Sequence, residues 1–426
     1  MLDIKYIREH AKEIKQMVQD RNKKVDVDGL LELDKKRREL ISEIDNTRAL
    51  QKKSGEGKDR DIEKLKKLKN QIKELEEKLV DVQKEFDALL PFVPNMPFAD
   101  VPIGKDENDN QIIKTVGKPT KFDFPAKDHQ ELGESLGIID IDRAAKISGA
   151  RFAYLKGGAA QLQMALIQYV YDILVGKEKF VPVIPPVIVK RETAANSGHP
   201  ETVGDEAYHL DQDDMFLVGT SEQSILPMYK DEILDEKDLP IKYLGYSTCF
   251  RREAGSYGKD TRGILRQHQF DKLEMFVFCK PQDSEKMHEH LLAMEEKLMQ
   301  GLNLPYRVVK LCTGDIGYPS AKTYDIETWM PSQDKYRETH STSNCTDYQT
   351  RNLNIKFRHS PSSRTERSVD AGSYEKSATE YVHALNGTAF AIGRIIIAIM
   401  ENYQQKDGSI AVPKVLQKYC GIKVIK

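Results

Sequence analysis

The sequence is poor in cysteine and contains a single tryptophan. Its five cysteines are scattered along 426 residues, are odd in number and include no CxxC pair. A disulfide framework or a structural zinc site needs paired, regularly spaced cysteines. The composition therefore predicts reduced thiols in the core and no zinc.

A long hydrophobic run is also missing. The most apolar stretch, AFAIGRIIIAIM at 389–400, is shorter than the roughly 18 residues that span a bilayer and carries Arg394. The first residues, MLDIKYIREHAKEIKQ, are charged and have no apolar signal-peptide segment. We therefore expect a cytoplasmic protein without a membrane segment.

The charges are abundant but balanced. Charged residues make up 31% of the chain, yet the formal net charge is −2, so a nucleic-acid partner would have to bind a local basic patch. Two phosphate-binding signatures are absent. No GxGxxG follows a predicted strand, and the Gly255–Lys259 segment lacks the spacing of a P-loop. A dinucleotide-binding fold is therefore not supported.

Two long charged helices dominate the first hundred residues. The first is predicted from about Asp28 to Gln51 and is followed by the glycine-containing segment 54–61. In the second helix, apolar residues alternate at spacings of three and four, which is the coiled-coil heptad. These residues are Leu65, Leu68, Ile72, Leu75, Leu79, Val82, Phe86 and Leu89. The pattern predicts an antiparallel hairpin, an arm at about 28–90 within a helical domain of residues 1–100.

Basic residues gather at the turn of this hairpin. From Arg48 to Lys73 there are ten basic and four acidic residues. The basic residues nearest the turn are Lys52, Lys53, Lys58, Arg60, Lys64, Lys66 and Lys67. Such a tip can bind a phosphate backbone, although a solvated coiled-coil face or a pairing surface for another protein has the same composition.

A proline-rich linker, Pro91–Asn110, separates the arm from a second domain, residues 111–426. Early in that domain, a long apolar helix is predicted at Gly157–Val175, followed by the proline-ended strand KFVPVIPPVIVK at 179–190. A helix and strand of this kind are typical either of the hydrophobic core of a domain or of the interface of a two-fold symmetric dimer.

The stretch Phe250–Phe270, FRREAGSYGKDTRGILRQHQF, concentrates charge between two strand-like segments, IKYLGYSTCF and QFDKLEMFVF. Arg251, Arg252 and Glu253 stand at its start, and Arg266 stands near its end. Arginine forks suit a phosphate-bearing ligand. A solvated hairpin loop with ion pairs explains the composition equally well.

Further polar residues follow apolar strands. The triplet Thr220-Ser221-Glu222 suits a small ligand with an amine, or else forms a helix N-cap. Glu274 alternates with apolar residues in a strand and is expected to point inward, where a carboxylate needs a partner.

Two clusters lie closer to the C-terminus. Glu338 and Ser341 can supply oxygen ligands to Mg²⁺ bound with phosphate, while His340 between them is equally typical of a buried structural histidine. Asn386-Gly387-Thr388 is expected on a tight element before an apolar helix. Arg394 near the start of that helix is electrostatically unfavourable, which favours an anionic ligand there.

Together these segments resemble the class II aminoacyl-tRNA synthetases, and among them the bacterial-type seryl-tRNA synthetases. KFVPVIPPVIV resembles motif 1, FRREAG…RGILRQHQF resembles the seryl form of motif 2, and LNGTAFAIGR resembles motif 3. GTSEQ, YRETHS and ENYQ resemble seryl signatures. The sequence departs from the family at Ser221, where alanine is usual, and at Thr388, where serine is frequent.

The resemblance implies an α+β protein: the helical arm plus a catalytic domain on a mixed, mainly antiparallel β-sheet flanked by helices. It implies ATP binding by Arg251, Arg252, Glu253, Arg266, Gln267, Phe270, Glu338, Thr339, His340, Ser341 and Arg394. Arg251, Glu253 and Arg394 would be catalytic, and Glu338 and Ser341 would hold Mg²⁺. Serine binding is implied for Thr220, Ser221, Glu222, Arg251, Glu274, Asn386 and Thr388.

The implied reaction is the activation of L-serine by ATP, followed by transfer to the tRNA for serine and, where it occurs, the tRNA for selenocysteine. The arm would bind the tRNA, and motif 1 would form a homodimer. Two alternatives stay open. One is an amino acid ligase that charges a carrier protein, whose relatives lack the arm; the other is a non-catalytic RNA-binding protein, which should have lost active-site residues.

Overall fold

The computed structural model describes residues 1–55, 61–195, 206–254, 262–360 and 379–426. The chain divides into two compact units, Met1–Met96 and Pro97–Lys426. Part of the predicted linker belongs to the second unit, because Val101 is buried with Val309 and Leu311. Within the described residues, no helix is both long and apolar enough to span a bilayer.

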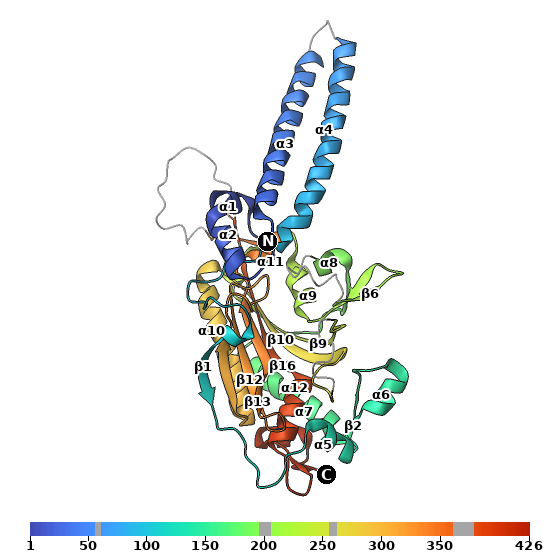
Figure 1. The fold of residues 1–426 in the computed structure, drawn as a ribbon, viewed down its shortest axis with the longest axis vertical. Coiled ribbons are helices and arrows are strands. Elements are labelled where there is room, and N and C mark those ends of the chain that lie inside the picture. Colours follow the sequence, from blue (N-terminus) through green and yellow to red (C-terminus); the bar gives the residue numbers. More distant parts are fainter. Residues whose placement is uncertain (56–60, 196–205, 255–261, 361–378) are drawn as a thin grey trace. The chain divides into compact units, whose positions relative to one another are not determined.

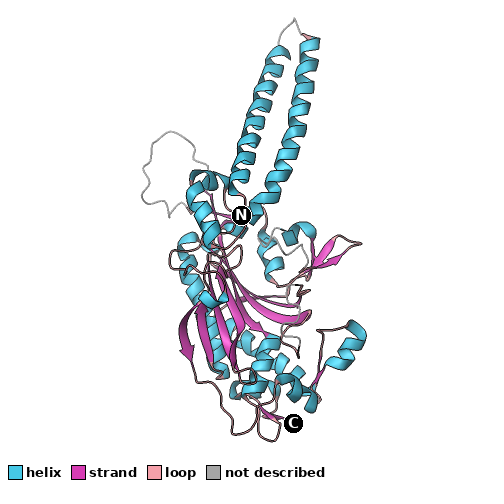
Figure 2. Cartoon of the chain, viewed as in Figure 1, coloured by secondary structure: helices cyan, strands magenta, loops and turns pink. Residues whose placement is uncertain are grey.

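The first unit contains the predicted helical hairpin (Figures 1 and 2). Its helices are α1 (Ile4–Glu9), α2 (Ala11–Asp20), α3 (Val27–Gly55) and α4 (Ile62–Leu89). The heptad residues of α4 are its least exposed ones, and Ile72, Leu75 and Phe86 are buried. An ion pair of 2.7 Å between Arg48 and Glu76 joins α3 to α4. The coiled-coil prediction is confirmed.

An eight-stranded sheet forms the centre of the second unit. Its order is β1–β11–β12–β13–β16–β10–β9–β4, and only the β4–β9 pair is parallel. The strands are β1 (Gln111–Val116), β11 (Tyr306–Lys310), β12 (Lys322–Met330), β13 (Lys335–Asn344), β16 (His383–Ala391), β10 (Gln269–Cys279), β9 (Ile241–Phe250) and β4 (Val181–Val183). The predicted mixed, mainly antiparallel sheet is confirmed.

Three helices cover one face of this sheet, namely α7 (Gly157–Leu174), α10 (Ser284–Leu302) and α12 (Ile392–Asn402) (Figure 1). Alternation along β10 directs Leu273, Met275 and Val277 into the core with these helices. The residues between them therefore face the opposite side of the sheet, where a cavity lies.

Smaller elements surround the sheet. The helices are α5 (His129–Ser135), α6 (Ile141–Ser148), α8 (Arg191–Ala195), α9 (Glu222–Ile225), α11 (Tyr348–Asn352) and α13 (Gln417–Cys420). The strands are β2 (Ile139–Asp140), β3 (Tyr154–Leu155), β5 (Ile188–Lys190), β6 (Tyr208–Leu210), β7 (Met215–Leu217), β8 (Ile233–Asp235), β14 (Lys356–Arg358), β15 (Thr379–Tyr381), β17 (Ile410–Ala411) and β18 (Val424–Ile425).

The two strands predicted on either side of the Phe250–Phe270 stretch are β9 and β10. They pair antiparallel, with Phe250 opposite Gln269. Asn386-Gly387-Thr388 lies inside the extended strand β16, whereas the sequence favoured a tight element. The reason is long-range pairing, because β16 lies between β10 and β13, and both neighbours satisfy its backbone.

Candidate active site

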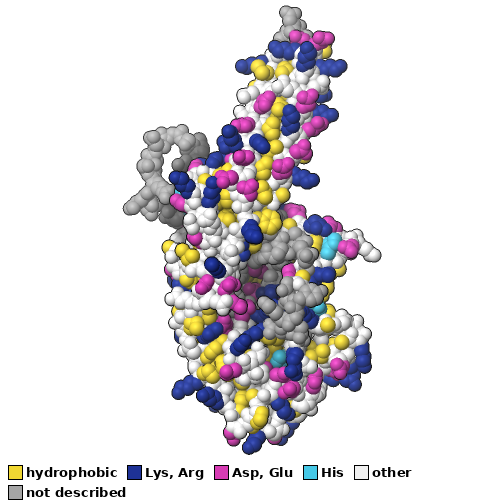
Figure 3. All heavy atoms as spheres, viewed as in Figure 1, with side chains coloured by type: hydrophobic (Ala, Val, Ile, Leu, Met, Phe, Trp, Pro, Cys, Tyr) yellow, Lys and Arg dark blue, Asp and Glu magenta, His cyan; other side chains and the backbone are white. Residues whose placement is uncertain are grey.

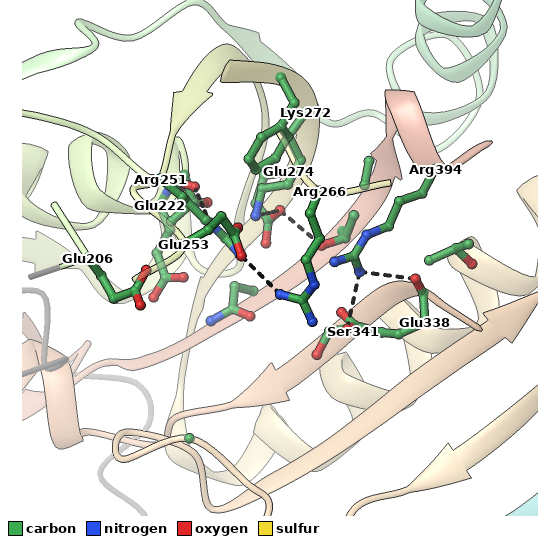
Figure 4. A pocket seen from close by; sticks show the side chains of 18 of the residues that line it. Glu206, Glu222, Arg251, Glu253, Arg266, Lys272, Glu274, Glu338, Ser341 and Arg394 are labelled. Carbon is green, nitrogen blue, oxygen red and sulfur yellow. Dashed lines mark hydrogen bonds and ion pairs between the residues drawn. The ribbon is translucent and has the colours of Figure 1, made fainter. Parts of the chain in front are cut away.

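A cavity of about 600 Å³ lies on the open face of the sheet. Its floor comes from five neighbouring strands, β12, β13, β16, β10 and β9, mainly through alternate residues such as Phe270, Lys272 and Glu274 on β10. Two β-bulges adjust this pattern. One sets Glu274 opposite Thr388, and the other lets both Glu338 and Thr339 face the cavity. Figure 4 shows the carboxylates and arginines pointing into a common space.

Three arginines line the cavity. Arg251, at the end of β9, donates from Nε to the Gly219 carbonyl oxygen at 3.2 Å, and its guanidinium lies 5.4 Å from the centre of the Phe270 ring. Arg266 Nη1 donates to Glu253 Oε2 at 2.9 Å. Glu253 itself has a left-handed backbone, with φ of 53°. The Gly219 carbonyl oxygen and the Glu253 carboxylate therefore fix the positions of two guanidinium groups in the cavity wall.

Arg394, in the first turn of α12, is the third arginine that lines the cavity. Its Nη1 lies 3.1 Å from Glu338 Oε2 and donates to the Glu338 carbonyl oxygen at 3.0 Å (Figure 4). Partial loss of water around Glu338, whose side chain is 49% exposed, opposes its ionisation, but the charge of Arg394 and its hydrogen bond outweigh that effect and lower the pKa of Glu338. The carboxylate is therefore ionised at neutral pH, as a cation ligand must be.

Buried carboxylates line the same cavity, and Glu222 lies near Arg251 (Figure 4). Glu222 is 6% exposed, and its Oε1 accepts a hydrogen bond from Gln349 Nε2 at 2.7 Å. Glu274 is 2% exposed and lies 2.7 Å from Lys272 Nζ, and Thr388 Oγ1 donates to it at 3.2 Å. Burial raises the pKa of Glu274, and the ammonium of Lys272 counteracts part of this.

Most of the predicted ligand residues line this one cavity. They are Thr220, Glu222, Arg251, Glu253, Arg266, Gln267, Phe270, Glu274, Glu338, Thr339, Ser341, Asn386, Thr388 and Arg394. A second cavity of about 790 Å³ adjoins the first and shares Arg266, Glu338 and Arg394 with it. The glycines Gly255 and Gly258 of the Phe250–Phe270 stretch lie outside the described residues.

Three predicted ligand residues lie outside the cavity lining. Ser221 is fully buried beside Gly245 of β9, and its side chain makes no N-cap hydrogen bond. The Arg252 guanidinium lies 5.7 Å from the centre of the Tyr208 ring. His340 is 1% exposed and contacts the Thr339 hydroxyl through Nδ1 at 2.9 Å, and burial lowers its pKa to about 3. The geometry favours a structural role for His340.

The sequence analysis missed three polar partners. Lys272 is two residues from Glu274 on the same strand, so the alternation that predicts an inward-pointing Glu274 predicts the same for Lys272. Gln349 reaches Glu222 across 127 residues, a contact that no local pattern indicates. Asp325 on β12 lies opposite Ser341 on β13.

The oxygen atoms near Glu338 suit a divalent cation. Burial and the nearby charge of Glu338 raise the pKa of Asp325 well above its usual range. Asp325 Oδ1 is buried and makes no hydrogen bond with the described residues. The ionised Glu338 carboxylate and the Ser341 hydroxyl present the hard oxygen ligands that Mg²⁺ prefers, whereas Asp325, whose pKa is raised, would have to lose its proton to join them. Within the described residues, no group of three His, Cys, Asp or Glu side chains forms a metal cage, so phosphate oxygens would have to complete the coordination.

Comparisons with known proteins agree with this geometry. Residues 1–97 match the family "Seryl-tRNA synthetase N-terminal domain", and residues 207–403 match "tRNA synthetase class II core domain (G, H, P, S and T)". The serine–tRNA ligase of Thermodesulfovibrio yellowstonii is 42% identical over the full length of both chains. That of Bdellovibrio bacteriovorus is 44% identical, over 99% of this chain and 98% of its own.

Solved structures give the same relationship. The seryl-tRNA synthetase of Pyrococcus horikoshii, solved with ATP, is 41% identical and has a TM-score of 0.89, covering 100% of this chain and 99% of its own. The cytoplasmic serine–tRNA ligase of Naegleria fowleri, solved with AMP, is 33% identical and has a TM-score of 0.85 over 100% and 99% of the two chains. The predicted resemblance is confirmed, and the chain belongs to the seryl-tRNA synthetases, within class II of the aminoacyl-tRNA synthetases.

Proposed function

We propose that this protein activates L-serine with ATP and transfers the seryl group to the tRNA for serine. The observation that carries the proposal is a single cavity that brings three arginines together with buried, partnered carboxylates. Arginines suit a triphosphate, and carboxylates suit an amino acid's ammonium group. Membership of the seryl family supports the same pairing of substrates.

At the nucleotide end, we assign Arg251 to the α-phosphate and Arg266 and Arg394 to the phosphate tail. Phe270 presents a ring on which adenine stacks, while Glu253 and the backbone at Gln267 orient the base. The ion pairs of Arg266 and Arg394 and the hydrogen bond of Arg251 to the Gly219 carbonyl oxygen support these roles, since they hold the guanidinium groups in place before the ligand arrives.

At the serine end, Glu222 receives the ammonium group, next to Thr220. Glu274, Asn386 and Thr388 bind the side-chain hydroxyl. The hydrogen bond of 3.2 Å from Thr388 to Glu274 supports this assignment, since it holds two of these groups close together in the cavity. Alanine would leave such buried groups unpaired, so the site discriminates against it.

The chemistry needs no general base, because the serine carboxylate is already ionised. One of its oxygens attacks the α-phosphorus, the bond to the β-phosphate breaks, and pyrophosphate leaves with its electron pair. The hydroxyl of the terminal tRNA ribose, the 3′-hydroxyl in our proposal, then attacks the carbonyl carbon. The bond from that carbon to the AMP phosphate oxygen breaks, and the leaving phosphate takes up the hydroxyl proton. The protein contributes positioning and charge stabilisation.

Glu338 and Ser341 would hold Mg²⁺, with Asp325 beside them. The ion, when bound, neutralises charge on the triphosphate. The hydrogen bond and charge of Arg394 fix the Glu338 carboxylate in its ionised form for this role.

We assign the tRNA to the tip of the helical hairpin. The side chains of Lys52, Lys53, Lys64, Lys66 and Lys67 are exposed there, whereas Lys58 and Arg60 lie outside the described residues. Figure 3 shows basic side chains on both sides of the hairpin near its far end. Such a surface binds the phosphate backbone and recognises the shape of the RNA more than its sequence.

We also propose a homodimer through the motif 1 region, in the cytoplasm. In the single chain Met164 of α7 is 63% exposed, and near β4 Val181 is 52% and Ile184 is 79% exposed. Apolar side chains this exposed are typical of an interface. Sedimentation of the purified protein tests this, because a monomer at micromolar concentration contradicts it.

Serine-dependent exchange of pyrophosphate into ATP, followed by charging of serine tRNA, tests the function. Both reactions are expected. Absence of exchange with serine would refute the proposal and favour a non-catalytic protein. Exchange without tRNA charging would instead indicate a ligase that acts on a carrier protein.

A further inference from the structure

The segment at the start of α5 contacts residues 262–264, the first described residues of the segment that leads into β10. Gln130 Oε1 accepts a hydrogen bond from the Gly263 backbone N–H at 3.0 Å. His129 Nε2 accepts one from the Ile264 N–H at 3.2 Å. Arg262 and Asp128 form an ion pair of 3.1 Å. Three consecutive residues are thus held immediately before Leu265 and Arg266, which line the cavity.

The two ring nitrogens of His129 have different partners. Because a backbone N–H points at Nε2, that nitrogen is the acceptor and the ring proton lies on Nδ1. Nδ1 lies 3.1 Å from Glu401 Oε1 and donates to it. His129 is 4% exposed and Glu401 is fully buried, so neither hydrogen bond competes with bulk water.

Glu401 links His129 to Ser332 and to helix α12. Its other oxygen, Oε2, accepts from the Ser332 backbone N–H at 3.1 Å and from the Ser332 hydroxyl at 2.7 Å. Glu401 lies near the end of α12, whose first turn carries Arg394. Seven residues of helix, about 10 Å, therefore separate the phosphate-tail arginine from the carboxylate that orients His129.

Gly263 is needed for this close approach. Its φ is +66°, and a Cβ at this position would lie 1.9 Å from His129 Nε2. Any larger residue would displace either the imidazole or the chain before Ile264. The imidazole and the glycine form a matched pair of neighbours, one from α5 and one from the segment that leads into β10.

We propose that His129 and Glu401 are positioning residues for ATP. They do not touch the nucleotide themselves. Their hydrogen bonds fix residues 262–264, and so place Leu265, Arg266 and Gln267 at the nucleotide end. The inference rests on the proposed binding of ATP in this cavity. The carboxylates at the serine end are held by Lys272 and Gln349 instead, so they do not depend on His129.

Two substitutions of similar size separate the two hydrogen bonds of His129. In His129→Gln the side-chain oxygen reaches about as far as Nε2 and can still accept from Ile264. In His129→Asn the shorter amide can still donate to Glu401 but cannot reach Ile264. The measurements are the dissociation constant for ATP by titration calorimetry and the KM values for ATP and serine in pyrophosphate exchange.

We expect His129→Asn to weaken ATP binding about tenfold, as expected for one lost buried hydrogen bond, with the serine KM within about twofold. His129→Gln should bind ATP within about threefold of the parent. Equal ATP affinity in the parent and both variants would overturn the proposal, and so would an equal rise of both KM values. Thermal melting confirms that each variant is folded.

A double-mutant cycle gives an independent test. Gly263→Ala should weaken ATP binding strongly in the parent but at least about fivefold less in a His129→Ala background, where the imidazole no longer occupies the space. Additive effects would overturn the proposed contact. If the parent binds ATP but shows no serine-dependent exchange, the proposed function fails, while the calorimetric comparison still decides the positioning role of His129.

Discussion

The helical unit and the catalytic unit use charge in opposite ways. Along the hairpin nearly all charged side chains are exposed; the exception is Asp34, which is fully buried against Arg8, Arg37 and Arg38. In the catalytic unit the charges that matter are withdrawn from water and paired, as in Lys272 with Glu274. The first arrangement suits a large polyanion, and the second suits small ions in fixed positions.

This difference has a physical consequence. Exposed charges act at long range and are screened by salt, and no single one of them is essential. Buried charges act over a few ångströms in a medium of low dielectric constant, where each hydrogen bond is stronger and each loss is costly. Substitutions in the two units should therefore differ in size and in salt dependence.

The largest effect is expected from Arg251→Ala. Loss of the guanidinium at the α-phosphate should lower kcat for pyrophosphate exchange about a thousandfold. Arg252→Ala is the matched control, because that guanidinium lies against Tyr208 outside the cavity. Similar losses in both variants would contradict the division between the two neighbouring arginines.

Acid should destabilise the catalytic unit before the helical unit. Burial lowers the pKa of His288 to about 4 and that of His340 to about 3. Below about pH 6.5 the unfolded chain protonates each of these histidines while the folded chain does not. Each therefore lowers the free energy of unfolding by up to about 1.4 kcal/mol per pH unit between pH 6 and 4, whereas Asp325 and Glu274, whose pKa values are raised in the folded chain, oppose part of this change.

The same comparison predicts a later transition for the hairpin. Burial would raise the pKa of Asp34, but hydrogen bonds from Arg8 and Arg38 outweigh it, and the pKa is lowered. Its contribution to stability is present above the ordinary pKa of 3.8 and is lost only as the pH falls through the lower folded value. Fluorescence of Trp329, the single tryptophan, follows the catalytic unit, and circular dichroism follows both units. Coincident acid transitions would contradict this prediction.

The serine end can be tested alone by Glu222→Gln. An ammonium group that loses a buried carboxylate partner loses about 2–3 kcal/mol, so the serine KM should rise about 50-fold or more. The ATP KM should stay within about twofold, because the arginines at the other end keep their own partners. A comparable rise in the ATP KM would show that the two ends are not independent.

The smallest effect is expected at the hairpin tip. Replacing Lys52, Lys53, Lys64 and Lys67 with glutamine should raise the KM for tRNA about tenfold near physiological salt and reduce the salt dependence of binding. Pyrophosphate exchange should not change. Lys36→Gln and Lys84→Gln, exposed charges farther from the turn, serve as controls. Equal loss in the control variant would contradict a role specific to the tip.

Much of the site could be predicted because its residues stand in short, locally recognisable segments. The strands around Phe250–Phe270 were identified from β-branched and aromatic residues, and alternation indicated that Glu274 points inward. The sequence did not indicate that the side chains of Ser221 and Arg252 lie outside the cavity. Which side chains reach the cavity depends on how β9 pairs with its neighbours. The prediction of a tight element at Asn386-Gly387-Thr388 was wrong, because the pairing of β16 with β10 and β13 is likewise set by the tertiary structure.

The sequence by itself determined the hairpin, since a heptad acts through neighbours three and four residues apart, and it determined the residue types that the site contains. Only the tertiary structure decided which of them meet. Gln349 reaches Glu222 across 127 residues, and His129 reaches Glu401 across 272 and Ile264 across 135. Such contacts depend on how the strands and helices pack, and that packing follows from burial summed over the whole core rather than from any local pattern.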